Sequence, residues 1–254
     1  MQKTLPLKRI IQTALLIAIT LILRNFSYMV FFGGNAGMRI GISTFFSKLP
    51  ALLFGPIYGG LTDGIIDILG YFIKPDGAYI PLLTLTAALG GVLVGLMWKG
   101  AKKINTKLFR NIFLVIFALF LIFGIANYIL SSSYPDLSYS KWLLKSEGKK
   151  LPFFTIAPII TAVLGLFIFT LDALHRKKFQ AQENFIKLFT VLFTANILVT
   201  TINTLILMFV YGYGKNGFLF FYIPRFVEEC IMTTLQSYVV SYLLQIYKKY
   251  NLGK

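Results

Sequence analysis

The sequence is poor in the residues that most enzyme and metal sites need. Its 254 residues include one cysteine, Cys230, and one histidine, His175. A single cysteine excludes an intramolecular disulfide and a multi-cysteine metal site, and a single histidine disfavours imidazole-based metal binding or general-base catalysis. The phosphate-binding pattern G-x-x-x-x-G-K-[ST] is also missing. We therefore expect no enzyme activity, no metal or bound cofactor, and no ATP site within this chain.

Acidic residues are scarce as well, because 9 Asp and Glu stand against 25 Lys and Arg, which gives a formal net charge of +16. Such a balance by itself would suit a nucleic-acid-binding protein. However, 57% of the residues are hydrophobic, the mean hydropathy is +0.74, and the basic residues gather between long apolar runs. This distribution indicates membrane topology rather than nucleic-acid binding, and it predicts an all-α, multi-pass integral membrane protein.

Apolar runs bounded by charge, proline or glycine predict eight transmembrane helices in a single domain, residues 1–254. Their approximate ranges are 8–24, 42–54, 57–73, 80–98, 108–130, 153–174, 186–211 and 221–247. Gly55-Pro56 separates the second helix from the third, because glycine ends one helix and proline suits the first turn of the next. With that division, the basic segments 99–110 and 175–187 fall on the same side as both termini. By the positive-inside rule, both termini are predicted to be cytoplasmic.

The third helix carries two acids at a depth where a charge is costly. On a helical projection, Asp63, Asp67 and Tyr71 share one face with Gly60 and Gly64, and aliphatic residues occupy the other face. The acids are therefore expected to face the bundle. An intramembrane acid either pairs with a buried base or belongs to a functional site. We interpret Asp63 as mainly structural and leave both alternatives open for Asp67.

Polar residues near the outer ends of the helices predict a ligand pocket. The candidate substrate-binding residues are Arg39, Lys48, Asp67, Tyr79, Thr84, Asn203, Arg225 and Glu229. Arg39 and Lys48 are expected to attract a carboxylate. Asn203 and Thr84 are expected to bond ring heteroatoms, and Glu229 to accept from a ring amide or amino group. For Arg225, an ion pair with Glu229 at i+4 that never meets a ligand is an open alternative.

Two stretches of the chain resemble a known transporter family. Residues 38–100 contain a Leu-Phe-Gly-Pro hairpin and an Asp-hydrophobic-Leu-Gly turn, and residues 203–232 contain Asn-Thr-Leu, Tyr-Gly and Pro-Arg motifs. In this order the motifs resemble the folate-type substrate-binding (S) components of energy-coupling factor (ECF) transporters. Three features differ: residues 107–178 are inserted, Leu205 stands where that pattern has tryptophan, and Glu228-Glu229 replaces a Lys-Asn-like pair.

The resemblance implies a six-helix S-component core in residues 1–106 and 179–254, with residues 107–178 inserted as an extra helix pair and outer loop. It implies a protein of the bacterial cell membrane that binds a small water-soluble vitamin, folate or a related compound, at an outward-facing pocket. Uptake would require a transmembrane coupling subunit and two cytoplasmic ATPase subunits as partners. Ala14 and Ala18, spaced as a small-xxx-small pair, would dock on the coupling subunit.

Two other functions are alternatives to vitamin capture. A stand-alone ion-coupled secondary transporter would use Asp63 and Asp67 as proton or sodium sites. A carrier built from two inverted halves should, however, show a second broken hairpin, and only one is evident. A membrane enzyme is disfavoured, because the sole imidazole, His175, lies at a predicted inner helix end.

Overall fold

The computed structural model describes residues 4–31, 37–75, 77–146, 152, 154–174, 182–212 and 217–252. The elements of the first half are α1 (Thr4–Arg24), β1 (Tyr28–Phe31), β2 (Gly37–Ile40), α2 (Thr44–Ser47), α3 (Leu49–Phe54), α4 (Pro56–Ile73) and α5 (Pro81–Gly100). The second half contains η1 (Ala101–Lys103), α6 (Thr106–Ser133), α7 (Ser138–Ser146), α8 (Ile156–Leu174), α9 (Gln182–Tyr211) and α10 (Phe218–Leu252).

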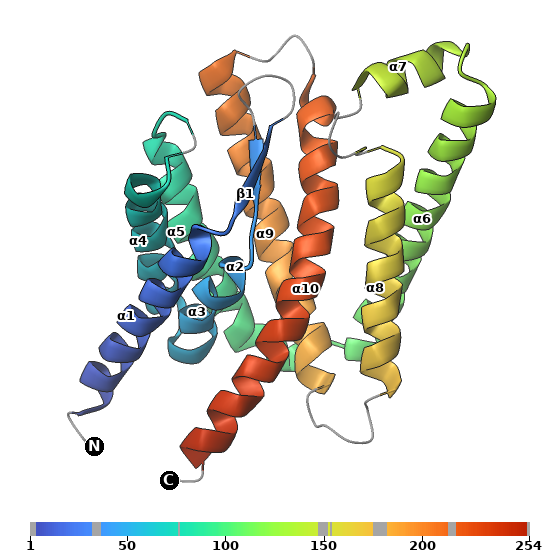
Figure 1. Cartoon of the computed structure of the whole chain (residues 1–254). Helices are drawn as coiled ribbons and strands as arrows, with labels where there is room; N and C mark the ends of the chain where they lie inside the picture. The colour runs from blue at the N-terminus through green and yellow to red at the C-terminus, as the bar shows by residue number, and fades with distance from the viewer. Residues whose placement is uncertain are drawn as a thin grey trace.

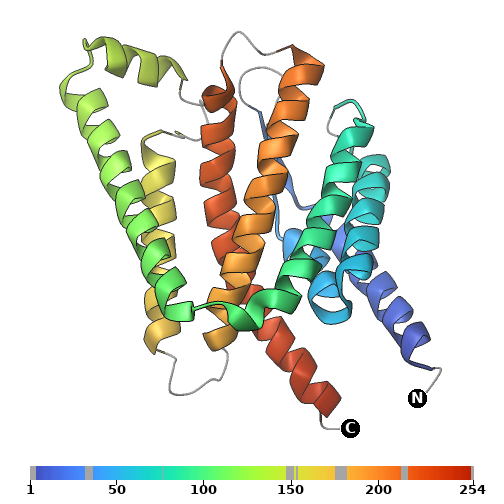
Figure 2. The same ribbon diagram turned by 180° about the vertical axis from the view of Figure 1, so that it is seen from behind.

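The long helices form one bundle in which each packs on the next. α4 packs on α5, α5 on α9, α9 on α10, α10 on α8 and α8 on α6, while α1 lies against α4 (Figures 1 and 2). The eight predicted spans correspond to α1, α2 with α3, α4, α5, α6, α8, α9 and α10. The predicted all-helical membrane fold is therefore confirmed. The chain starts and ends at the same end of the bundle (Figure 1), and the cytoplasmic location of that end stays a prediction.

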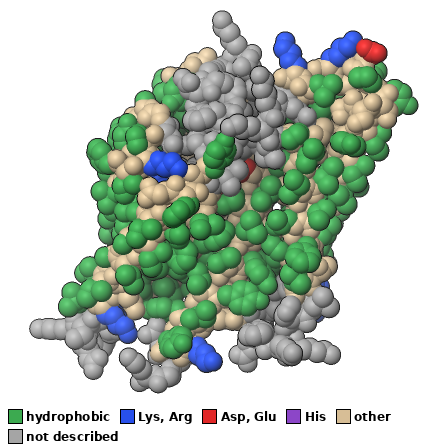
Figure 3. Space-filling view, in the orientation of Figure 1, with side chains coloured by type: hydrophobic (Ala, Val, Ile, Leu, Met, Phe, Trp, Pro, Cys, Tyr) green, Lys and Arg blue, Asp and Glu red, His purple; other side chains and the backbone are tan. Residues whose placement is uncertain are grey.

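Within the described residues, three helical segments are long and apolar enough to cross a membrane by length and composition alone: Pro81–Gly100, Thr106–Ser133 and Phe185–Tyr211. Thr44–Phe54 and Ile156–Leu171 are shorter apolar segments. Hydrophobic side chains cover most of the middle of the visible face, and Lys and Arg lie mainly near its ends (Figure 3). This surface is the one expected of a protein surrounded by lipid.

The segment after α1 contains a two-stranded ribbon that the helix-based prediction missed. β1 and β2 pair antiparallel, with Met29 opposite Arg39. The sequence signal was present, since β1 reads Tyr-Met-Val-Phe and is followed by Gly33-Gly34. Apolar and aromatic residues next to a glycine pair are typical of a hairpin.

The second predicted span is broken at Lys48, between α2 and α3. Pro50 lies in the first turn of α3. Proline has no backbone N–H to donate and disfavours helical geometry at the preceding residue, Leu49, which favours a break in the helix at this point. The break leaves Lys48 at the junction of two short helices, where its side chain can enter the bundle.

The helical projection of α4 is confirmed by burial. Asp63 is 6% exposed, whereas Leu61 and Phe72 on the opposite face are 59% and 76% exposed. The packing seam with α5 is shifted by one position from the Gly60–Gly64 pair. A Cβ on Gly59 would collide with the backbone of Gly91, whereas a Cβ on Gly64 would make ordinary contact with Ala88 at 3.5 Å. Close approach of α4 and α5 therefore depends on Gly59 and Gly91.

The assignment of residues 107–178 as an inserted pair stays a prediction. In the structure α6 and α8 pack against each other, with ring contacts of Phe113 and Phe117 to Phe169, and α8 also packs on α10. This region shares a cluster of buried phenylalanines with the start of α9: Phe113, Phe117, Phe169, Phe185 and Phe189. A second, aliphatic cluster joins α3, α5, α9 and α10.

Candidate functional site

A cavity of about 360 Å³ lies between α2, α9 and α10, with Leu83 of α5 also at its wall. Most of the side chains around it are polar or charged, although it lies within an apolar bundle. α9 contributes Asn196, Thr200 and Asn203, which are spaced i, i+4 and i+7 and so share one helix face. This stripe is where the polar groups of α9 meet those of α10.

Glu229 links α9 to α10 at the wall of the cavity. Its Oε2 accepts a hydrogen bond from the Thr200 hydroxyl at 3.1 Å, and its Oε1 accepts one from the Thr233 hydroxyl at 3.0 Å. The Asn196 amide donates to Thr233 Oγ1 at 3.2 Å and to Gln236 Oε1 at 3.4 Å. Glu229, Thr233 and Gln236 follow the same i, i+4, i+7 spacing on α10 as the polar residues follow on α9.

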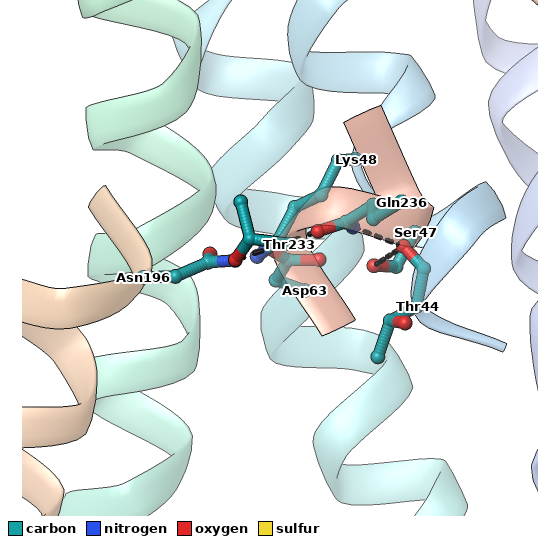
Figure 4. A network of polar contacts seen from close by, with 7 residues as sticks. All are labelled: Thr44, Ser47, Lys48, Asp63, Asn196, Thr233 and Gln236. Carbon is teal, nitrogen blue, oxygen red and sulfur yellow. Dashed lines mark hydrogen bonds and ion pairs between the residues drawn. The ribbon is translucent and has the colours of Figure 1, made fainter. Parts of the chain in front are cut away.

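The network continues from α10 to the broken helix (Figure 4). Gln236 Nε2 donates to the backbone carbonyl of Thr44 at 2.5 Å. At the break, Lys48 Nζ forms an ion pair with Asp63 Oδ2 of α4 at 2.6 Å. Both partners are largely shielded, with side chains 15% and 6% exposed. A shielded pair of this kind matches the structural role that the sequence suggested for Asp63.

A smaller cavity of about 190 Å³ lies on the other side of Lys48, between α1, α2 and α4. Arg24, Asp63 and Asp67 are among the residues at its wall. Arg24 Nη1 donates to the backbone carbonyl of Ile66 at 3.1 Å. Thr44, Ser47 and Lys48 line both cavities, so the broken helix lies between the two.

Four of the predicted site residues, Lys48, Asn203, Arg225 and Glu229, come together around the main cavity. Asp67 instead lines the smaller one. The Asp67 carboxylate accepts from Thr84 at 2.6 Å, and the Thr84 and Tyr79 hydroxyls are 2.8 Å apart. Neither Tyr79 nor Thr84 is among the residues at the wall of these two cavities. The side chain of Arg39, in β2, lies outside the part of the chain that is described.

Arg225 is buried, 6% exposed, and Glu228 and Glu229 follow it by three and four residues on α10. A pair of Arg225 with Glu229 stays a prediction. Glu229 turns to hydroxyl donors. The helix period allows Arg225 to pair with either acid.

Several polar residues of the cavity wall were not among the candidate substrate-binding residues: Thr44, Ser47, Asn196, Thr200, Glu228 and Gln236. The helix period offered a signal for those on α9 and α10, since they extend the stripes of Asn203 and Glu229. Thr44 and Ser47 had no such signal, because they enter the site through the helix break before Leu49.

The predicted docking residues lie on an accessible face of α1. Ala14 and Ala18 are both exposed, as are the neighbouring Ile11, Leu15 and Ile22. A surface of small residues flanked by large aliphatic ones permits close approach of another transmembrane helix. The role of these alanines stays a prediction.

Comparison with known proteins places the chain in a family. A family model described as "ECF-type riboflavin transporter, S component" matches residues 4–174. A curated relative, "Folate transporter FolT" of Clostridium novyi (strain NT), is 36% identical over 70 residues, which are 28% of this chain and 40% of the relative. That match therefore spans less than half of the relative's length. No solved structure matches the chain significantly. Because the family match covers most of the chain, the protein belongs to the S-component family of ECF-type transporters, which are transport proteins and not enzymes.

Proposed function

We propose that this chain is the substrate-binding subunit of an ATP-driven vitamin uptake transporter in the bacterial cell membrane. The observation that carries the proposal is the polar cavity between α2, α9 and α10 inside an apolar bundle. Charged and amide groups at membrane depth are costly and are typical of substrate sites. The S-component family match and the folate transporter relative support a vitamin as the ligand.

Residues of the main cavity contact the ligand in this proposal. Asn203 bonds a ring heteroatom, Glu229 accepts from a ring amide or amino group, and Lys48 and Arg225 complete the polar wall. Asp67 contributes to ligand binding from the smaller cavity. Thr84 and Tyr79 do not contact the ligand but position Asp67, because their hydroxyls form the hydrogen-bonded chain that holds its carboxylate.

Uptake depends on partners, a transmembrane coupling subunit and two ATPase subunits, and Ala14 and Ala18 form the contact with the coupling subunit. Replacing both with tryptophan should abolish vitamin uptake by cells that produce the whole transporter, because the bulky rings prevent close helix approach. Ligand binding by the purified variant should be unchanged, since neither alanine lines the main cavity.

Val115 and Leu119 provide the matched control for that experiment. They lie on α6 with the same i, i+4 spacing and are 59% and 58% exposed. Tryptophan at both positions should leave uptake intact. Uptake that survives in the Ala14→Trp/Ala18→Trp variant would show that the docking surface lies elsewhere.

Reconstitution of the purified chain alone tests the proposal against ion-coupled transport. Asp63 and Asp67 both line the smaller cavity, as a proton or sodium site would require. However, Asp63 is ion-paired with Lys48, and Asp67 accepts from Thr84. We expect liposomes containing only this chain to accumulate no vitamin under an imposed proton or sodium gradient. Gradient-driven accumulation without ATPase subunits would overturn the proposed function.

A further inference from the structure

We propose that the ligand of this site carries no net negative charge: it is a neutral or singly cationic heteroaromatic compound that presents N–H groups to Glu229. The inference rests on the proposed function and narrows the class of vitamin. It separates the two ligands that the comparisons bring forward, because riboflavin is uncharged at neutral pH whereas folate carries two carboxylates.

The charged side chains around the two cavities do not balance. Of the residues that the structure describes there, the bases are Arg24, Lys48 and Arg225, and the acids are Asp63, Asp67, Glu228 and Glu229. Acids therefore outnumber bases by one. A surplus of negative charge in a shielded site favours a cationic or N–H-donating ligand and disfavours an anion, because electrostatic interactions are strong where water is scarce.

The bases are already engaged by groups of the protein. Lys48 is ion-paired with Asp63 at 2.6 Å, Arg225 lies one turn of α10 before Glu228, and Arg24 Nη1 donates to the Ile66 carbonyl at 3.1 Å. A ligand carboxylate that paired with Lys48 would have to displace Asp63. Displacement would leave an acid such as Asp63, 6% exposed, without its counter-ion, which is strongly unfavourable.

The Glu229 carboxylate can accept further hydrogen bonds. The Thr200 and Thr233 hydroxyls donate one hydrogen bond to each of its carboxylate oxygens, and the Asn196 amide also bonds to it. An ionised carboxylate offers about four lone-pair sites, so at least one acceptor position is left for a ligand. Lys48 also attracts Glu229 electrostatically, but its ammonium group is held by Asp63. A ligand that brings N–H groups or a positive charge would complete this partly satisfied carboxylate.

The rest of the main cavity suits a flat ring. Leu83, Val199 and Met232 supply aliphatic surface, and the amides of Asn196 and Asn203 supply hydrogen-bonding groups at the wall. A heteroaromatic ring combines apolar faces with a polar edge, which is the combination that such a wall recognises.

The test compares ligands that differ in charge. The full-length chain, purified without ligand, is titrated by calorimetry at neutral pH and low salt with riboflavin, thiamin, folate and biotin, which are neutral, cationic, dianionic and anionic. We expect riboflavin or thiamin to bind at least 100-fold more tightly than either anion. Folate whose carboxylates are converted to methyl esters should bind more tightly than folate itself, a comparison that needs no variant.

Glu229→Gln then probes the acid directly. It should weaken binding of the preferred ligand at least tenfold. It should also reduce the ratio between the affinities for that ligand and for folate. Asn127→Leu is the control, because Asn127 is a buried amide on α6 that lines neither cavity, and it should change no affinity. If Glu229→Gln does not fold, the comparison of folate with its methyl ester still shows whether the site disfavours an anionic ligand.

The outcomes separate this inference from the proposed function. Tighter binding of folate or biotin than of riboflavin and thiamin would overturn the charge assignment and leave vitamin capture intact. A folded chain that binds no vitamin of any charge, and that releases no small molecule when denatured, would overturn the proposed function and this inference with it.

Discussion

The two halves of one face of α9 have different roles, one in helix packing and the other in lining the cavity. Phe185, Phe189 and Phe193 in the first half recur at the same helical spacing as Asn196, Thr200 and Asn203 in the second, at i, i+4, i+8, i+11, i+15 and i+18. The first half packs against aromatic rings of α6 and α8, and the ring centroids of Phe113 and Phe189 are 4.4 Å apart. The second half lines the cavity. The period of a buried stripe therefore indicates which residues point inward, and residue type indicates which part is a site.

The two halves are also held together by different forces. In a bilayer the hydrophobic effect does not drive helices together, so close packing and interhelical hydrogen bonds carry the association. The phenylalanine half relies on edge-to-face ring contacts such as Phe113–Phe189 and Phe169–Phe189. The polar half relies on bonds such as Thr200–Glu229 and Asn196–Gln236. Substitutions in the first half should thus affect stability alone, and those in the second should also affect ligand binding.

The largest effect on stability is expected at the ion pair beside the polar half. Asp63→Asn leaves the Lys48 ammonium shielded from water without its counter-ion, so we expect a loss of about 4 kcal/mol in the free energy of unfolding. Thermal unfolding of the purified protein in detergent measures it. The double variant Lys48→Met/Asp63→Leu should recover most of the loss, because both charges are removed. Wild-type stability in Asp63→Asn alone would mean that the pair is not a structural element.

A substitution in the phenylalanine half should lower the stability of the protein and leave its ligand affinity unchanged. Phe189, which is 1% exposed, contacts rings of α6 and α8, and its replacement by alanine should cost about 3 kcal/mol. The affinity of the Phe189→Ala variant for the ligand should stay within about twofold of wild type, a change below about 0.5 kcal/mol. Phe209→Ala, at a side chain 87% exposed, is the control and should change stability by less than about 0.5 kcal/mol. A large affinity loss in Phe189→Ala would show that the two halves are coupled.

Substitutions in the close contact between α4 and α5 test whether this packing holds Asp63 in place. A Cβ on Gly91 would overlap the backbone of Gly59 and lie 2.8 Å from Asp63 Oδ2. Gly91→Ala should therefore destabilise the protein by about 2 kcal/mol through overpacking. Gly64→Ala, whose Cβ would make ordinary contact with Ala88 at 3.5 Å, should unfold at or above the wild-type temperature. Equal effects at both positions would argue against a specific close approach at Gly91.

Much of the fold could be predicted from sequence, because it rests on local patterns. Apolar runs gave the spans, Gly55-Pro56 gave the turn between the second and third helices, and the helix period placed Asp63 inside and Leu61 outside. The ribbon of β1 and β2 and the break at Lys48 were missed, because short elements between spans carry weak periodicity.

The candidate site could be predicted only in part, because its contacts join distant segments. Lys48 and Asp63 lie on different helices, and Gln236 bonds to the carbonyl of Thr44, 192 positions away. No spacing rule connects such pairs. Glu229 was identified from its charge, but its two hydroxyl donors depend on how α9 packs on α10.

The central claim is that the cavity between α2, α9 and α10 holds a water-soluble vitamin. The most direct measurement is mass spectrometry of the small molecule released on denaturation from purified wild-type protein and from Met232→Trp, which fills the cavity. Phe209→Trp, on the exposed surface, serves as control. We predict one vitamin per chain from wild type and from the control, and none from Met232→Trp. Equal amounts from all three proteins would place the ligand elsewhere and contradict the account.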